Sequence, residues 1–358
     1  MKPHIFAQLA EDGLAMPVGT DLVLHEKPDR SAILLDGRRL GEVVAEAAAR
    51  YNTPLAFPLM DLTVEKEAIA VALGVAPEMA DSFHLDRPLS PDEKSRVAAA
   101  VRNDPTPRMK ANTEAIRHIA ETADLVPVGM SIGPFSLMTK LIADPITPVF
   151  LSGSGLGPED DPEIAVMESV LDVAEAVVAE SLKQQAGAGA SAVFVCEPAA
   201  NIAYFSPNQL AEGAPTFERY ALEPNRRLKA LLDDLGVSLI FHDCGELTDD
   251  MVRSFGAMRP VVLSLGSSRT LWEDAALVPK EVVLYGNLPS KKFYSDDLTT
   301  VDNVSAMAGE LVLKMRETGH PFILGSECDV LSVSGSEDRI KAKVAAFLTA
   351  GRKPRGAL

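Results

Sequence analysis

Cysteine is scarce in this chain, with three residues among 358. So small and odd a number excludes a disulfide framework and indicates free thiols or metal ligands in a reducing compartment. Long apolar runs are also missing, because none approaches the roughly 20 residues that a membrane span needs. The start of the sequence shows no apolar stretch with a small-residue cleavage site. We therefore expect a cytoplasmic protein that does not associate with membranes.

Positive charge is scarce as well. The 34 Lys and Arg residues are outnumbered by 51 Asp and Glu residues, which gives a net charge of −17, and no basic tract occurs. This composition excludes nucleic acid as an expected partner, because phosphates favour clustered Lys and Arg. Hydrophobic residues make up 47% of the chain, which is enough for a large buried core.

From about residue 50 onward, short apolar runs alternate with longer segments of helical period, a pattern typical of βαβ units. Eight such units favour an α/β fold of the TIM barrel type, (β/α)8, and the alternative is a seven-stranded open sheet, because the second predicted strand is the least pronounced. The predicted strands are Thr53–Met60, Ser82–Arg87, Leu125–Met130, Ala192–Cys196, Val237–His242, Pro260–Leu265, Glu281–Tyr285 and Pro321–Leu324.

Two segments make up the predicted domain organisation. Residues 1–50 are predicted to form an N-terminal extension that caps the barrel, and residues 51–358 the barrel itself. Within the extension we expect a hairpin over Asp21–Leu35 and a helix over Gly41–Tyr51.

Soft metal ligands stand at the ends of two predicted strands. His242 and Cys244 end one apolar run, and Cys328 ends another. Side chains two apart on a strand share one face, and the carboxyl ends of barrel strands form one rim. One imidazole and two thiolates with an open fourth position are typical of catalytic zinc. For the His-x-Cys pair alone, a pair of ordinary core residues is the alternative.

Two glutamates are candidates for the fourth zinc ligand or for proton transfer. Glu197 follows the strand Ala192–Cys196, and Glu327 precedes Cys328. The alternative is that both are ordinary loop carboxylates. Gly133 opens a helix whose backbone N–H groups could receive an anionic group, and a simple turn is the alternative there.

Several motifs in order resemble one known superfamily over most of the chain. They are Pro58–Leu62 with Glu65 and Gly74, Gly133–Ser136, Phe205–Pro207, His242–Gly245, Tyr285–Pro289, and Phe322–Gly325 before Cys328. The set resembles the uroporphyrinogen decarboxylases and the cobalamin-dependent methyltransferases related to methylcobamide:coenzyme M methyltransferase. The resemblance implies a barrel fold, and it marks Gly133 and Asn287 as candidate cofactor-binding residues.

Details at the motifs are more similar to the methyltransferase branch. The decarboxylases carry an N-terminal Arg-Gln-Ala-Gly-Arg segment, and residues 1–60 of this chain contain nothing similar. The decarboxylases also carry Gly-His-Gly after the last strand, where this chain has Ser326–Asp329. The methyltransferase resemblance implies that His242, Cys244 and Cys328 are zinc ligands. The chain lacks the Thr-Pro pair that usually follows the last cysteine, so its substrate pocket is expected to differ. Asp61 matches an aspartate that binds pyrrole nitrogens in the decarboxylases, and a structural strand-end cap is the alternative.

The resemblance and the zinc chemistry together predict a zinc-dependent methyltransferase. It would move a methyl group between a corrinoid and a small-molecule thiol acceptor, or a methyl ether or methanol-type donor. The chain has no Asp-x-His-x-x-Gly segment, so the corrinoid is expected on a partner protein. Two thiolate ligands favour a thiol acceptor, while Glu327 as a proton donor would favour ether cleavage. A decarboxylase that relies on Asp61 and arginines is the alternative enzyme, and a metal-stabilised binding protein is the third possibility.

Overall fold

The computed structural model describes residues 4–351, so the outer ends of the two predicted segments, residues 1–3 and 352–358, lie outside it. Its strands form one parallel sheet in the order β1-β8-β7-β6-β5-β4-β3-β2. The strands are β1 (Ala15–Val18), β2 (Leu55–Ala56), β3 (Val126–Ile132), β4 (Ala192–Cys196), β5 (Ser238–Asp243), β6 (Val262–Leu265), β7 (Val283–Leu288) and β8 (Phe322–Asp329).

The sheet curls around a core of its own. One apolar cluster takes a buried side chain from every strand, namely Met16, Leu55, Val128, Phe194, Ile240, Val262, Val283 and Ile323. The ends of the sheet also meet, because the Thr53 hydroxyl donates to Met16 Sδ at 3.4 Å, although no backbone ladder joins β1 to β2 within the described residues. The predicted α/β fold of the TIM barrel type is therefore confirmed.

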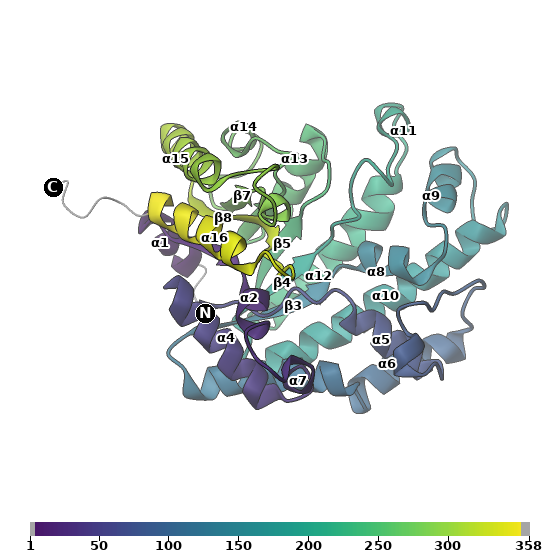
Figure 1. Ribbon diagram of the computed structural model, residues 1–358. Coiled ribbons are helices and arrows are strands. Elements are labelled where there is room, and N and C mark those ends of the chain that lie inside the picture. Colours follow the sequence, from purple (N-terminus) through teal and green to yellow (C-terminus); the bar gives the residue numbers. More distant parts are fainter. Residues whose placement is uncertain (1–3, 352–358) are drawn as a thin grey trace.

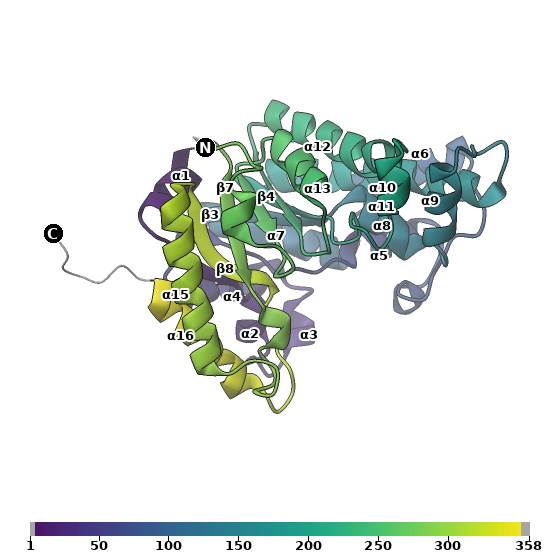
Figure 2. The same ribbon diagram turned by 90° about the horizontal axis from the view of Figure 1, so that it is seen from above.

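Helices surround this sheet (Figures 1 and 2). The α-helices are α1 (His4–Glu11), α2 (Thr20–Leu24), α3 (Arg30–Ile33), α4 (Gly37–Tyr51), α5 (Val64–Ala72), α6 (Pro91–Asn103), α7 (Pro107–Thr122), α8 (Pro134–Leu141), α9 (Ile146–Gly153), α10 (Pro162–Gly187), α11 (Pro207–Ala211), α12 (Glu223–Asp234), α13 (Asp249–Ala257), α14 (Leu271–Asp274), α15 (Val301–Thr318) and α16 (Glu337–Gly351). Three short helices complete the chain: η1 (Pro77–Met79), η2 (Glu218–Leu222) and η3 (Ser290–Lys292). Between residues 4 and 351, no helix combines the length and the apolar character that a membrane span requires.

The longest helix, α10, connects the barrel to an outlying group of helices. Asp161 accepts hydrogen bonds from the backbone of Glu163 and Ile164, and Pro162 occupies the first turn, so the start of α10 is well capped. The helix packs against α5, α6, α8 and α9. Both ribbon views show α9 at the far end of the molecule from α15 and α16 (Figures 1 and 2).

One predicted strand is wrong and one strand was missed. Residues 82–87 form turns and irregular structure rather than a strand. Their apolar spacing has another cause, because Leu85 is buried and its N–H donates to Leu141 O at the end of α8. The missing strand is β1, which pairs with β8 and lies within the predicted N-terminal extension. It escapes detection because it is four residues long and contains Pro17.

The predicted hairpin over Asp21–Leu35 is also wrong. This segment contains the short helices α2 and α3, and α2 buries Leu22, Val23 and Leu24, which a strand with one solvent face would not do. The predicted helix over Gly41–Tyr51 is confirmed as the main part of α4. Asp36 caps its start by accepting the N–H of Arg39.

Candidate metal centre

His242, Cys244 and Cys328 come together at the mouth of the barrel. His242 is in β5, Cys244 directly follows β5, and Cys328 is in β8. Their ligand atoms all lie within 4.8 Å of one another, and the two Sγ atoms are 3.8 Å apart. Two sulfurs bound to one tetrahedral zinc at about 2.3 Å would be about 3.8 Å apart. The spacing of this trio, defined by these three side chains, therefore suits zinc.

A neighbouring strand orients the imidazole of the trio. His242 pairs in register with Ser264 of β6, and His242 Nδ1 lies 2.8 Å from Ser264 Oγ. The other ring nitrogen, Nε2, is buried and has no hydrogen-bond partner in residues 4–351. Leaving such a nitrogen unpaired costs about 1–3 kcal/mol. A metal at Nε2 requires the proton on Nδ1, and the Ser264 hydroxyl can accept it.

The two thiols form a hydrogen bond with each other, with 3.8 Å between the sulfurs. This bond lowers the pKa of Cys244, with help from His242 and Lys291. The same bond raises the pKa of Cys328. Burial alone would lower the pKa of Lys291. Its interactions with Cys244, Cys328 and Glu327 outweigh this effect, so the pKa of Lys291 is raised. One thiolate therefore forms easily, as metal binding requires.

Glu327 is fixed beside the trio by backbone and hydroxyl donors. It is 5% exposed, and its Oε2 accepts from Ser267 N at 3.1 Å and from Ser267 Oγ at 2.6 Å. Its Oε1 accepts from the backbone N–H of Lys291 at 3.3 Å. Asn287 Nδ2 donates to the carbonyls of Gly266 and Arg269, which holds the loop that carries Ser267. The structure thus gives Glu327 and Asn287 partners within the loops next to Cys328.

Glu197 and Gly133 contact each other at the end of β4, the strand next to β5, and the Glu197 N–H donates to His242 O at 2.8 Å. The Glu197 carboxylate is fully buried and accepts from Phe135 N at 3.1 Å, Ser136 N at 2.8 Å and Asn225 Nδ2 at 2.8 Å. Burial raises its pKa. A Cβ at Gly133 would lie 2.1 Å from Glu197 Cδ, so glycine is required for this approach. The donors at the start of α8, which we expected to receive a substrate anion, are occupied by this side chain.

Asp61 follows β2 and lies close to the trio. Its Oδ1 accepts from Thr63 N at 3.1 Å and Oγ1 at 2.7 Å, and its Oδ2 accepts from Arg108, which also pairs with Glu67 at 2.7 Å. The preceding residue, Met60, places its Sδ 3.6 Å from Cys328 Sγ. Asp61 therefore approaches the trio through one intervening side chain.

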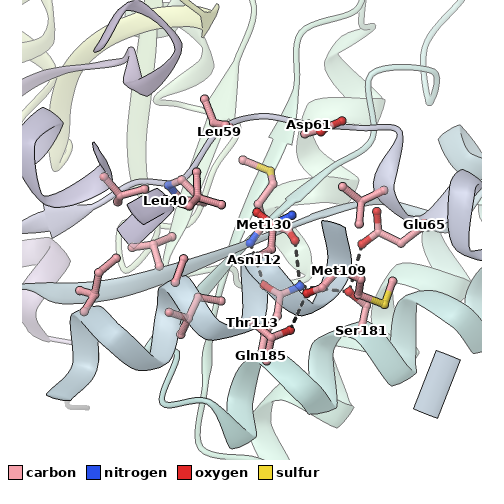
Figure 3. A pocket seen from close by; sticks show the side chains of 17 residues that line it. Leu40, Leu59, Asp61, Glu65, Met109, Asn112, Thr113, Met130, Ser181 and Gln185 are labelled. Carbon is pink, nitrogen blue, oxygen red and sulfur yellow. Dashed lines mark hydrogen bonds between the residues drawn. The ribbon is translucent and has the colours of Figure 1, made fainter. Parts of the chain in front are cut away.

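A small cavity lies behind Asp61, between the barrel wall and α4, α7 and α10 (Figure 3). It measures about 30 Å³, enough for one or two waters, and Glu65 lines it. Glu65 Oε1 accepts from Ser131 Oγ at 2.7 Å and Ser181 Oγ at 3.0 Å, whereas its buried Oε2 has no partner in the described part of the chain. Burial raises the pKa of Glu65 to about 7, so this carboxyl keeps its proton more strongly than an exposed one.

A known protein family matches most of this chain. The family described as Uroporphyrinogen decarboxylase (URO-D) matches residues 31–347. The chain belongs to the uroporphyrinogen decarboxylase family. This membership confirms the resemblance drawn from the sequence motifs.

Two solved structures are similar to this family member. A methyltransferase from Methanosarcina mazei matches with a TM-score of 0.69 and 17% identity, over 96% of this chain and 98% of that chain, which shows the shared fold. A B12-independent methionine synthase from a Shewanella species, solved in complex with selenomethionine, matches with a TM-score of 0.44 and 14% identity, over 67% of this chain and 65% of that chain. No curated protein sequence matches.

In this uroporphyrinogen decarboxylase family member, sequence reasoning missed several residues at the mouth. Ser264 had a usable signal, because it is the one hydroxyl in the strand Val262–Leu265 and fully buried. Met60, Ser267 and Lys291 carried no comparable signal. Only the fold brings Met60 and Lys291 to the trio and Ser267 to Glu327, from loops that follow three different strands.

Proposed function

We propose that this protein is a zinc-dependent methyltransferase. It moves a methyl group between a corrinoid, carried by a partner protein, and a small-molecule thiol acceptor. The observation that carries the proposal is the trio itself, with sulfurs 3.8 Å apart and a buried, unpartnered His242 Nε2. Two thiols and one imidazole leave a fourth position for a substrate, as catalytic zinc sites do.

The donor set suits the chemistry of a thiol substrate. Zinc in this position would lower the pKa of a thiol, while the two cysteine thiolates would keep that sulfur nucleophilic. In the transfer, the sulfur–carbon bond forms as the carbon–cobalt bond breaks, with its electron pair left on cobalt and the thiol proton released to solvent. Ser264 contributes by holding the His242 ring in the orientation that frees Nε2.

The surroundings of Glu327 support the thiol direction over ether or methanol demethylation. Ether cleavage needs a proton donor at the leaving oxygen. Both carboxylate oxygens of Glu327 already accept hydrogen bonds, from Ser267 and from the backbone of Lys291. With both oxygens held by these donors, the Glu327 side chain fixes the loops beside Cys328, which suits a structural role better than proton donation to a substrate.

The test combines metal analysis with cobalt spectroscopy. Purified protein should contain about one zinc per chain and should demethylate methylcob(III)alamin with thiols, followed by the cobalt absorption bands. Chelation should abolish the reaction and zinc should restore it. Substoichiometric zinc after growth with added zinc would overturn the metal site, and methylation of cob(I)alamin from an ether would overturn the direction.

The second candidate function is decarboxylation of the uroporphyrinogen type. It is favoured by the family match and by Asp61 paired with Arg108 at the barrel mouth. This reaction needs no metal, so release of CO₂ from uroporphyrinogen by chelator-treated protein would support it. Activity in that assay, together with silence in both cobalt assays, would replace the methyltransferase proposal.

A further inference from the structure

A second cavity opens on the trio's side of the barrel mouth. It has a volume of about 300 Å³ and lies over the ends of β1, β2 and β8, where α2 and α3 cover it. Met60 lines this cavity and also contacts Cys328, with 3.6 Å between the two sulfurs. A molecule in the cavity would therefore reach the trio past a single side chain. We call it the head-group cavity; it is lined by Asp21, Leu24, His25, Arg30, Ser31, Leu34, Leu59, Met60, Asp61, Asp329 and Leu331.

One carboxylate oxygen of this cavity lacks a partner. Asp329 is 9% exposed, and its Oδ1 is buried without a hydrogen bond to any described residue. The other two carboxylates are engaged, because Asp21 accepts from Ser332 N at 2.7 Å and pairs with His25 at 3.1 Å, while Asp61 pairs with Arg108. A buried acceptor without a donor is costly, so the cavity is suited to a ligand that brings N–H groups.

One cation of this cavity is also unengaged. Arg30 is exposed, and its guanidinium makes no hydrogen bond or ion pair with the described residues, although its backbone carbonyl accepts from Leu34 N at 3.1 Å. Its neighbour Asp29 pairs with Arg39 instead, at 2.6 Å. A guanidinium in this state is well suited to a carboxylate, which it can bind through two parallel hydrogen bonds. The four leucines of the cavity, Leu24, Leu34, Leu59 and Leu331, offer an apolar lining beside the charged groups.

We propose that the head-group cavity binds an amino-acid-type head group, and that the methyl acceptor is a thiol bearing both an ammonium and a carboxylate. The ammonium donates to Asp329 and lies near Asp21, and the carboxylate pairs with Arg30. A short methylene chain then carries the thiol past Met60 to the trio. That the ligand carries a thiol rests on the proposed function. That it carries an ammonium and a carboxylate rests on the cavity alone.

The experiment uses calorimetric titration of the full-length, zinc-loaded protein. The probes are homocysteine, 3-mercaptopropylamine, 4-mercaptobutanoate and 1-propanethiol, which differ in the charged groups they carry. A fifth probe, 2-aminobutanoate, has the head group without sulfur. We expect loss of either charged group to weaken binding about 10-fold, as expected for losing one charge-assisted contact, and 2-aminobutanoate to bind measurably. Equal affinity for 1-propanethiol and homocysteine would overturn the proposal.

Single substitutions assign each contact. Arg30→Gln should remove the advantage of the carboxylate and leave binding of 3-mercaptopropylamine unchanged, and Arg39→Gln, which alters the neighbouring pair with Asp29, is the matched control. Asp329→Asn should remove the advantage of the ammonium. Because Asp329 is adjacent to Cys328, its zinc content is measured in parallel, and Asp21→Asn replaces it if zinc is lost.

The outcomes separate the two proposals. If 2-aminobutanoate binds in a manner sensitive to Arg30→Gln but no thiol demethylates methylcob(III)alamin, the head-group cavity stands and the methyltransferase fails. If all thiols react equally well and neither substitution alters their relative affinities, the methyltransferase stands and the head-group cavity fails.

Discussion

Replacing Ser264 by alanine tests whether His242 is a zinc ligand held by its neighbour. The Ser264 hydroxyl lies 2.8 Å from His242 Nδ1, and both residues are at most 1% exposed. Water cannot replace the lost hydroxyl easily, so Nδ1 is left unpaired, which costs about 1–3 kcal/mol. If this cost destabilises the zinc-bound state, the zinc Kd should rise roughly 10–100-fold. This is the range seen when residues that orient metal ligands are removed.

The assay is competition for zinc with a chromogenic chelator, supported by thermal unfolding with and without zinc. A 10–100-fold weaker Kd should reduce the stabilisation by zinc by about 1.4–2.8 kcal/mol at saturating metal. Ser169→Ala is the matched control, because Ser169 is also buried and its hydroxyl accepts from Leu89 N at 2.9 Å, far from the trio on α10. The control should lose stability with no change in zinc Kd. Unchanged zinc affinity in Ser264→Ala would refute the reasoning.

Three further substitutions test other groups in and near the barrel mouth. Cys244→Ala should lose zinc while the fold survives, whereas Cys196→Ala, at a fully buried thiol of β4, should keep zinc; full zinc in the first variant would reject the ligand assignment. Asp61→Asn should lower turnover more than melting temperature, while Glu67→Gln, which breaks the other ion pair of Arg108, should lower only stability. Parallel losses of activity and stability in Asp61→Asn would favour a structural cap. Burial raises the pKa of Glu65 from 4.5 to about 7. Between these pH values the folded state holds a proton that the unfolded state has released. The free energy of unfolding should therefore fall as the pH rises from about 4.5 to 7, by roughly 3 kcal/mol in total. Glu65→Gln should flatten this dependence in denaturant titrations, and an unchanged pH profile would contradict the assignment.

Most of the barrel was predictable because apolar runs mark buried strands. Ala192–Cys196 coincides with β4, and six further predicted strands overlap β2, β3, β5, β6, β7 and β8. Strands β1 and β2 were harder, because they are four and two residues long and lie where no ladder joins the two ends of the sheet. The alternating apolar residues Phe83 and Leu85 wrongly predicted a strand, because residues with this spacing can pack equally well against a helix end.

The trio was predictable for a different reason. His242 and Cys244 share a strand end, and Cys328 ends another strand of a barrel whose carboxyl ends meet at one rim. The occupant of the α8 donors was not predictable, because Glu197 reaches Phe135 and Ser136 across more than 60 residues of chain. Backbone N–H groups at a helix start attract an anion, but local sequence does not say whether it comes from a substrate or from the chain itself.

Whether the chain itself satisfies a buried polar group or leaves it without a partner bears on where the barrel mouth can bind a ligand. At the start of α8 Glu197 supplies the anion internally, with both oxygens partnered and a glycine that admits it, so the N–H groups of Phe135 and Ser136 are not free for a substrate. By contrast, His242 Nε2 and Asp329 Oδ1 are buried without partners among the described residues. Since an unpaired buried polar atom destabilises the fold, its persistence is best explained by a ligand that completes it. In the functions proposed above, His242 Nε2 would mark the metal position and Asp329 Oδ1 the head-group position for one substrate.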